Sequence, residues 1–273
     1  MVRFAVPPVS DTGPSSFRIP VSAIAIIPAR YDSSRLPGKA LADIAGRPMI
    51  EHVYRRAAAA ARVSRVIVAT DDRRILDAVL RFGGEAVMTS ASHQSGTDRL
   101  AEAAAALDCD LVVNVQGDEP VLAPETIDAA VEPFATNPAL EMSTLRRAIA
   151  DPAELHNPNV TKVVVDRDGF AMYFSRAPIP YTRAGQPAAG AWAHIGLYVY
   201  RRATLLRIAS LPQTAMERAE ALEQLRALEH GIRIKAIETA HETIGVDTRE
   251  DLARVRELIA HGPDPRSPRP LTT

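Results

Sequence analysis

The stretch Ala23-Ile-Ala-Ile-Ile-Pro28 decides the fold, because the rest of the chain repeats its pattern. It is a short, continuous apolar run, which is typical of a strand buried on both faces inside a parallel sheet. Two runs of the same kind follow, Arg65-Val-Ile-Val-Ala-Thr70 and Leu111-Val-Val-Asn-Val-Gln116. Helical patterns separate the runs. The sequence therefore predicts βαβ units and an α/β fold, with a mostly parallel sheet covered by helices on both faces.

The helices between these strands are predicted from their apolar periodicity and their ends. The segment Pro48 to Arg62 has a proline in its first turn, and Asp72 to Phe82 presents Ile75, Leu76, Val79 and Leu80 on one face before Gly83-Gly84 stops it. Further strands are expected at Glu141–Arg147, Thr161–Val165, Ile195–Tyr200 and Arg233–Glu238. Two helices are expected to close the chain, Glu217–His230 and one that starts at Asp247-Thr248.

Shifts in composition suggest the domain boundaries. Residues 1–22 and His261–Thr273 are rich in proline and are interpreted as disordered extensions of one domain over residues 23–260. The segment 152–190 holds several prolines and glycines and breaks the βα alternation. We expect it to be an insertion with small strands of its own, suited to a lid or a dimer contact.

The composition excludes several classes of protein. The chain has 273 residues, 47% of them hydrophobic, and a formal net charge of −1, so it is neither a disordered chain nor a basic nucleic-acid binder. Its single cysteine, Cys109, rules out an internal disulfide or a cysteine metal cage and is expected to be a small buried hydrophobe. No apolar stretch approaches the ~20 residues of a membrane span. We expect a cytoplasmic protein without membrane insertion.

Three cations follow the first strand within one short loop, namely Arg30, Arg35 and Lys39. Ligands of open α/β sheets bind at the carboxyl ends of the strands, and arginine forks with a mobile lysine suit a triphosphate. The usual phosphate motifs are absent. No two glycines are spaced as G-x-G, and Ser33 and Ala40 stand where a P-loop requires glycine and Ser or Thr.

Carboxylates complete the pattern at the same edge of the sheet. Asp118 follows the third strand, and Gly117 before it permits a close backbone approach or an unusual dihedral angle. Magnesium is usually held by one or two carboxylates and the substrate phosphates, so Asp118 is a good first ligand. Asp247 precedes a helix, and the pattern alone favours a capping role for it, although Thr248 could cap instead. Glu119 is expected to have a structural partner.

At this point the sequence resembles a known family, the bacterial 3-deoxy-manno-octulosonate (Kdo) cytidylyltransferases, or CMP-Kdo synthetases. The resemblance covers Ala23 to Ile259 and rests on the following segments in order: Ile27-Pro-Ala-Arg-Tyr31, Arg35-Leu-Pro-Gly-Lys39, His93-Gln-Ser-Gly-Thr97, Asn114-Val-Gln-Gly-Asp-Glu-Pro120, Asn157-Pro-Asn159, Tyr173-Phe-Ser-Arg176, His194-Ile-Gly-Leu-Tyr198, Leu222-Glu-Gln-Leu-Arg226 and Gly245-Val-Asp-Thr248. It implies a three-layer αβα, Rossmann-like nucleotidyltransferase fold with a small inserted dimerisation or lid subdomain.

The resemblance also implies an activity. Such an enzyme transfers CMP from CTP to the anomeric 2-hydroxyl of Kdo and releases pyrophosphate, in lipopolysaccharide biosynthesis, with Mg2+ and as a homodimer. The implied catalytic residues are Arg30, Lys39, Asp118 and Asp247, and the two aspartates are the implied metal ligands. The implied nucleotide-binding residues are Ala29, Arg30, Arg35, Lys39, Ser95, Gly96 and Arg99. The implied sugar-binding residues are Gln116, Arg176, His194, Tyr198, Glu223 and Gln224.

Pattern alone gives several of these residues ordinary roles. His194 would end a loop, Tyr198 would be a core aromatic, and Glu223 and Gln224 would be solvated positions on a helix. Ser95 and Gly96 would form the turn before a helix Asp98–Leu107 that Thr97 caps.

Other functions remain open at this stage. The acceptor could be an 8-amino octulosonate or a sialic-acid-type sugar, and the chain could be a nucleotide-binding module without activity. A glycosyltransferase would use a D-x-D motif, which Asp108-Cys-Asp110 matches in spacing. That motif precedes its strand, at the wrong edge of the sheet, so we discount it.

Overall fold

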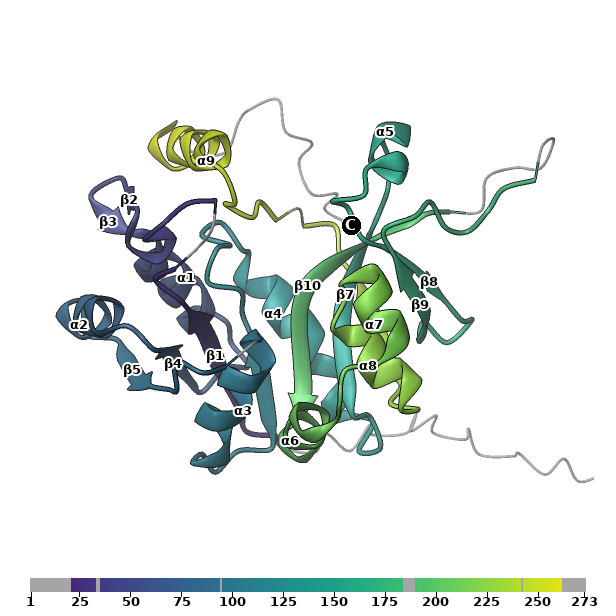
Figure 1. The fold of residues 1–273 in the computed structure, drawn as a ribbon, viewed down its shortest axis with the longest axis horizontal. Helices are drawn as coiled ribbons and strands as arrows, with labels where there is room; N and C mark the ends of the chain where they lie inside the picture. The colour runs from purple at the N-terminus through teal and green to yellow at the C-terminus, as the bar shows by residue number, and fades with distance from the viewer. Residues whose placement is uncertain (1–20, 33–34, 94, 184–189, 242, 262–273) are drawn as a thin grey trace, which may run out of the picture.

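A computed structural model of the chain describes residues 21–32, 35–93, 95–183, 190–241 and 243–261. Within these ranges, nine strands form one sheet, and helices lie on both of its faces (Figure 1). The extensions that the sequence predicts at 1–22 and 261–273 lie outside the described residues, except for Val21, Ser22 and His261.

Seven strands form the main path of the sheet. Their order is β11 (Ile234–Glu238), β7 (Met142–Ala148), β10 (Trp192–Arg201), β6 (Leu111–Asn114), β1 (Ala23–Ala29), β4 (Arg65–Thr70) and β5 (Glu85–Met88). Only β10 is antiparallel to its neighbours in this path; the other neighbouring pairs are parallel. The prediction of a mostly parallel sheet is therefore confirmed. The sequence did not predict strand β5, because it has only four residues and only two of them, Ala86 and Val87, are both apolar and partly buried.

Alternation along β1 divides the core into two layers. Ala25 and Ile27 face one side, which α1 (Met49–Ala58), α2 (Arg73–Arg81) and α4 (Pro124–Val131) cover. Ile24 and Ile26 face the other side, which α3 (Gly96–Ala105), α6 (Arg202–Ser210) and α8 (Gln224–Glu229) cover. This is the predicted three-layer αβα arrangement (Figure 1). One detail was wrong: Leu80 is 53% exposed and lies outside the packed face of α2.

The segment 152–190 contributes α5 (Pro152–His156), β8 (Lys162–Val165) and β9 (Ala171–Ser175). The predicted small strands therefore exist. They are joined to the main sheet, because β8 pairs with the start of β10 and β9 pairs with β8. The proposed role of this segment as a lid or dimer contact remains a prediction.

The end of the chain departs from the sequence-based prediction. The single helix expected over Glu217–His230 is two helices, α7 (Ala215–Glu220) and α8, separated by Ala221 in the left-handed conformation at φ 51°. Arg176, which follows β9, stabilises the break, because it donates hydrogen bonds to the carbonyls of Glu220 and Ala221. No glycine or proline marks this break in the sequence, so periodicity alone did not reveal it.

The last helix, α9 (Arg249–His261), packs away from the main sheet. Its Leu252 and Val255 form a third apolar cluster with Ile44 and Met49. Ile44 belongs to the short hairpin of β2 (Asp43–Ile44) and β3 (Arg47–Pro48). The short 3-10 helices η1 (Lys39–Leu41) and η2 (Glu132–Ala135) complete the described elements. None of the helices in the described part of the chain is long and apolar enough to cross a bilayer.

Candidate active site

The basic loop after β1 turns back on itself at Gly38. The backbone N–H of Gly38 donates to the carbonyl of Tyr31 over 2.9 Å. Gly38 has φ 69°, and a side chain there would meet the Tyr31 ring at 3.3 Å, so this turn requires glycine. The turn starts η1 with Lys39 as its first residue, which directs the lysine side chain toward the carboxyl ends of the strands.

Lys39 joins the two aspartates that the resemblance identified. Its Nζ lies 2.7 Å from Asp118 Oδ2 and 3.1 Å from Asp247 Oδ1. Burial alone would lower the pKa of the Lys39 ammonium, but the two carboxylates outweigh that effect and raise it. A second cation from the loop, Arg35, contacts the other oxygen of Asp247 at 3.0 Å. The basic loop and both carboxylates therefore meet at one point.

Backbone contacts hold the two aspartate segments together. The N–H of Val246 donates to the carbonyl of Asp118 over 2.9 Å, so Asp247 follows directly beside Asp118. Gly117 makes a close approach of the kind that the sequence suggested, because a Cβ there would lie 2.9 Å from the carbonyl oxygen of Pro28. The positions of both carboxylates thus depend on backbone packing against the end of β1.

Thr248, and not Asp247, caps α9. The Thr248 hydroxyl accepts from the Asp251 N–H over 3.1 Å, while the Asp251 carboxylate accepts from the Thr248 N–H over 2.9 Å. This reciprocal pair is a capping box. The capping role that pattern alone favoured for Asp247 is therefore wrong, and the Asp247 side chain is left to face Lys39 and Arg35.

The two carboxylates of Asp118 and Asp247 fit a hard divalent cation that also binds the substrate. Within the described ranges, no three His, Cys, Asp or Glu side chains gather as a metal-binding group. Asp118 and Asp247 alone would therefore supply the protein ligands. Magnesium binds in this way, through one or two carboxylates, substrate phosphates and water.

Glu119 lies next to the pair but takes no part in it. It is 8% exposed, and burial together with the Asp118 carboxylate raises its pKa to about 8. Its side chain is hydrogen-bonded to Thr243, in the loop that leads to Asp247. This contact agrees with the structural role expected for Glu119.

A cavity of about 200 Å³ opens beside these residues. Four of the six expected sugar-binding residues line it, together with one expected nucleotide-binding residue: Gln116, Tyr198, Glu223, Gln224 and Gly96. Gln116 is oriented by its Nε2, which donates to the carbonyl of Gly196 over 3.2 Å. Gly196 lies opposite Gln116 just beyond the β10–β6 ladder, which ends at the pair Tyr198 and Asn114. The fold thus brings most of the expected sugar side together.

His194 lies behind this cavity and does not line it. Its Nε2 is 2.9 Å from Thr144 Oγ1, and its ring packs against Phe174 and Tyr198 at centroid distances of 4.9 and 5.4 Å. Burial lowers the pKa of His194 to about 3, so the ring is neutral at physiological pH. Burial also raises the pKa of Tyr198 well above its usual range. His194 therefore supports the Tyr198 wall of the cavity as a neutral group.

The expected nucleotide segment begins α3. Ser95 caps the helix through a capping box with Asp98, so the cap assigned by pattern to Thr97 is wrong. Arg99 is fully buried, where it is paired with Asp71 over 2.6 Å and hydrogen-bonded to Thr89. These partners hold its guanidinium inside the protein, where it is not exposed to a nucleotide. Asp71 is the group that Arg99 positions.

One further nucleotide-side residue, Arg30, lies at a second, polar cavity. Arg30 and Asp71 both line this space of about 340 Å³, with Asp72 and His93 among its other walls. Arg30 is exposed, whereas Ala29 before it is buried at the end of β1. The loop cations therefore border both the aspartate pair and this cavity.

Arg176 does not reach either cavity. Its guanidinium donates to the carbonyls of Pro158 and Glu220 over 3.0 and 2.8 Å, and of Ala221 over 3.4 Å. These acceptors use three of its five N–H donors. The structure thus gives Arg176 a different position from the expected one: it holds the turn that precedes Glu223.

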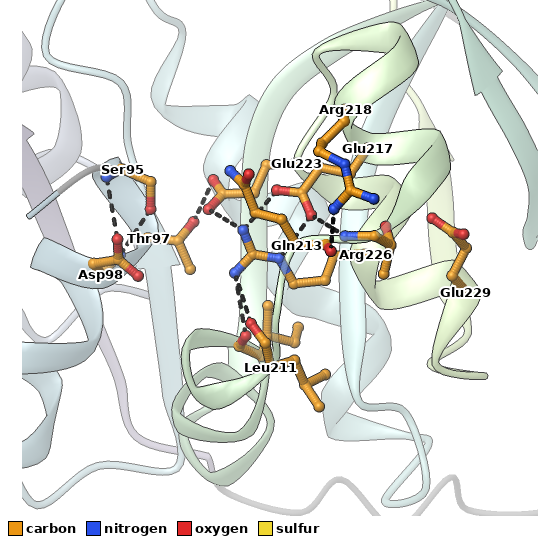
Figure 2. A network of polar contacts seen from close by, with 12 residues as sticks. Ser95, Thr97, Asp98, Leu211, Gln213, Glu217, Arg218, Glu223, Arg226 and Glu229 are labelled. Atoms are coloured by element: carbon orange, nitrogen blue, oxygen red, sulfur yellow. Dashed lines mark hydrogen bonds and ion pairs between the residues drawn. The ribbon is translucent and has the colours of Figure 1, made fainter.

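Several polar residues of the cavity were not identified from the sequence. Asn114, Thr97 and Tyr200 line it, and Arg226 lies behind it in a buried pair with Glu217 (Figure 2). A polar residue inside an apolar strand, such as Asn114, is a signal that could have been used. Thr97 and Arg226 carried no such signal, because their importance comes from contacts with residues far away in the sequence.

Comparisons with known proteins agree with this site. A family model for cytidylyltransferases matches residues 24–235. The chain is 53% identical over 249 residues to a 3-deoxy-manno-octulosonate cytidylyltransferase of Trichlorobacter lovleyi, covering 88% of this chain and 99% of that protein. It is 56% identical over 243 residues to the protein of the same name in Syntrophotalea carbinolica, covering 86% and 97%.

Solved structures are similar as well. One is described as CMP:2-keto-3-deoxy-manno-octonic acid synthetase in complex with CTP, with a TM-score of 0.84 and 48% identity over 88% of this chain and 98% of that one. A 4-diphosphocytidyl-2C-methyl-D-erythritol synthase from Anaerococcus prevotii has a TM-score of 0.58 at 14% identity, over 89% of this chain and 100% of that one. This second similarity shows a shared fold only.

Proposed function

The chain belongs to the 3-deoxy-manno-octulosonate cytidylyltransferase family, and from this membership and the site we infer that it makes CMP-Kdo. It transfers the CMP group of CTP to the anomeric 2-hydroxyl of Kdo. The hydroxyl oxygen bonds to the α-phosphorus, the bond from that phosphorus to the oxygen bridging to the β-phosphate breaks, and pyrophosphate leaves. The hydroxyl proton is lost as the new bond forms. The observation that carries this proposal is the contact of Lys39 with both Asp118 and Asp247.

The cations of the first loop would hold the triphosphate. Phosphoryl transfer depends mainly on positioning and on charge stabilisation. Lys39 supplies a point charge at the aspartate pair, and the Arg35 fork lies beside it. Arg30 extends the positive charge along the loop toward the polar cavity. We assign the catalytic roles to Arg30, Lys39, Asp118 and Asp247 on this basis.

We propose that Asp118 and Asp247 hold Mg2+. When bound, the ion polarises the α-phosphate and lowers the pKa of the attacking hydroxyl. The contribution of the chain is to keep the two carboxylates close together. Lys39 does this by contacting both of them, and the bond from Val246 to Asp118 keeps their segments together.

The cavity beside the pair would hold the sugar. Gln116, Tyr198, Glu223 and Gln224 provide donors and acceptors for a polyhydroxylated acid, and the space of about 200 Å³ is small. We assign Ser95 and Gly96, at the start of α3, to the nucleotide side because of the family membership, and Gly96 also borders the sugar cavity.

We also propose a homodimer in the cytoplasm, where nucleoside triphosphates and Mg2+ are available. The partner subunit would contact the segment 152–190. Met172 in β9 and Tyr181 support this assignment, because they are large apolar side chains that are 66% and 88% exposed. Sedimentation of the purified protein tests the dimer, and a monomer would contradict it.

The activity is tested by incubating the protein with Mg2+ and each ribonucleoside triphosphate, with and without Kdo, and measuring pyrophosphate release. Release is expected only when CTP and Kdo are both present. Release with every triphosphate, or release that does not depend on the sugar, would overturn the assignment. Parallel reactions with the 8-amino analogue of Kdo and with a sialic acid establish the acceptor, and a preference for either of them would correct it.

A further inference from the structure

We propose that Thr97 is a positioning residue for Glu223, which it holds in the orientation in which this side chain lines the sugar cavity. The proposal rests on the proposed function of the cavity. It goes further in naming a residue on the nucleotide side of the site that sets the geometry of the sugar side. The contacts that support it are drawn in Figure 2.

Glu223 stands between two open spaces. It lines the cavity of about 200 Å³ and also a second hollow of about 390 Å³ on its other side, to which Arg218 and Gln213 contribute. Its side chain is 34% exposed. A carboxylate with space on both sides has several accessible rotamers, and fixing one of them costs conformational entropy. Its orientation toward the sugar therefore depends on the hydrogen bonds that hold it.

Thr97 provides the hydrogen bond that fixes Glu223. The Thr97 hydroxyl donates to Glu223 Oε2 over 2.7 Å, across 126 residues of sequence. Thr97 is only 3% exposed, so water competes little for this bond. A carboxylate oxygen can only accept, so the single hydroxyl proton of Thr97 is the one in this bond.

The other oxygen, Glu223 Oε1, is buried and has no hydrogen-bond partner within the described part of the chain. The nearest cation is Arg226, whose Nη2 lies 3.7 Å away, beyond hydrogen-bond distance. Arg226 thus forms only a long ion pair with Glu223, and its hydrogen bonds to a carboxylate go to Glu217 at 2.6 and 2.9 Å. A buried acceptor without a donor is costly unless a ligand supplies one.

Thr97 connects the nucleotide side of the site to its sugar side. Thr97 lies in the first turn of α3, directly after Ser95 and Gly96, whereas Glu223 directly precedes α8. The cap of α3 uses the side chains of Ser95 and Asp98, not that of Thr97. Removing the Thr97 hydroxyl should therefore disturb the sugar side while the nucleotide side stays in place.

The test uses the full-length Thr97→Val protein, in which a methyl group of similar size replaces the hydroxyl. We expect the KM for Kdo to rise about tenfold, as for the loss of one hydrogen bond to a charged group, while the KM for CTP changes by less than about twofold. Thr97→Ser keeps the donor and should restore the KM for Kdo. Thr204→Val is the matched control, because Thr204 is 5% exposed and donates to a glutamate, Glu141, outside both cavities.

Two results would overturn the proposal. One is a Thr97→Val protein whose KM for Kdo equals that of the wild type, or whose KM values for Kdo and CTP rise together. The other is a full additional effect of Thr97→Val in a Glu223→Ala background, where a residue that acts through Glu223 should have almost no further effect. An inactive wild type would instead refute the proposed function, so the two failures are distinguishable.

Discussion

The ammonium of Lys39 lies 2.7 Å from the carboxylate of Asp118, although 79 residues separate them. The same ammonium lies 3.1 Å from Asp247, which is 208 residues away. Two carboxylates placed this close repel each other, so the cation between them is what makes the arrangement stable. A loop, a strand end and a helix start thus form one charged centre at the carboxyl edge of the sheet.

Removing one carboxylate should abolish turnover without unfolding the protein. For Asp118→Ala and Asp247→Asn we expect kcat/KM to fall by about 10³-fold, because charge stabilisation is usually the largest catalytic term. In Asp247→Asn the Mg2+ concentration for half-maximal rate should also rise. Asp151→Asn is the control, since Asp151 is an exposed carboxylate that caps α5. Substantial activity in Asp118→Ala would remove this residue from the metal site.

A methyl group at position 117 should displace the catalytic loop. In Gly117→Ala the new Cβ would meet the carbonyl oxygen of Pro28 at 2.9 Å, so the backbone next to Asp118 must shift. We expect a loss of stability of about 1–3 kcal/mol and at least a tenfold loss of kcat. Gly245→Ala in the neighbouring loop is the matched control, because its Cβ has no described atom within 4 Å. Equal kinetics for both variants would contradict the close approach.

Stability should decrease as the pH falls below about 6.5, and His194 should cause part of the decrease. Burial lowers its pKa to about 3 in the folded protein, whereas the unfolded chain takes up a proton near its ordinary value of 6.5. The unfolded state therefore binds more protons between these pH values, and the free energy of unfolding decreases as the pH is lowered. By pH 5 the loss is about 2 kcal/mol.

Urea unfolding at pH 7 and pH 5 measures this effect. The variant His194→Gln should show a smaller decrease between the two pH values than the wild type. His156→Gln is the control, because it makes the same substitution at an exposed histidine at the end of α5. A wild-type slope retained in His194→Gln would show that another group causes it.

One substitution should stabilise the protein. The hydroxyl of Thr126 in α4 is buried and lacks a hydrogen-bond partner among the described residues, and the residue is 0% exposed. Thr126→Val replaces this hydroxyl with a methyl group of the same shape, so we expect the free energy of unfolding to rise by about 1 kcal/mol. Ser143→Ala should do the opposite, because the equally buried Ser143 donates to the Ala130 carbonyl over 2.7 Å. Thermal unfolding of both variants checks the contrast.

Much of the architecture was readable in advance, because apolar runs and helical periodicity report burial and local hydrogen bonding. The strands that became β1, β4 and β6 were recognised from such runs, and the loop from Arg30 to Lys39 from its charge and position after a strand. The segments that resemble the cytidylyltransferases identified Asp118 and Asp247 as the carboxylates expected near that loop. These signals lie within a few neighbouring residues, which is why they can be read without coordinates.

Contacts between distant segments had to come from the folded molecule. The break at Ala221 contradicts the single helix that the pattern predicted. The burial of Arg99 against Asp71 and the hydrogen bonds from Arg176 to backbone carbonyls could not be read from the sequence. The bond from Thr97 to Glu223 carries no local signal at all. Each of these contacts depends on which surfaces meet when the helices pack onto the sheet. The hydrogen-bond partners at such surfaces are determined by the tertiary structure and not by spacing along the chain.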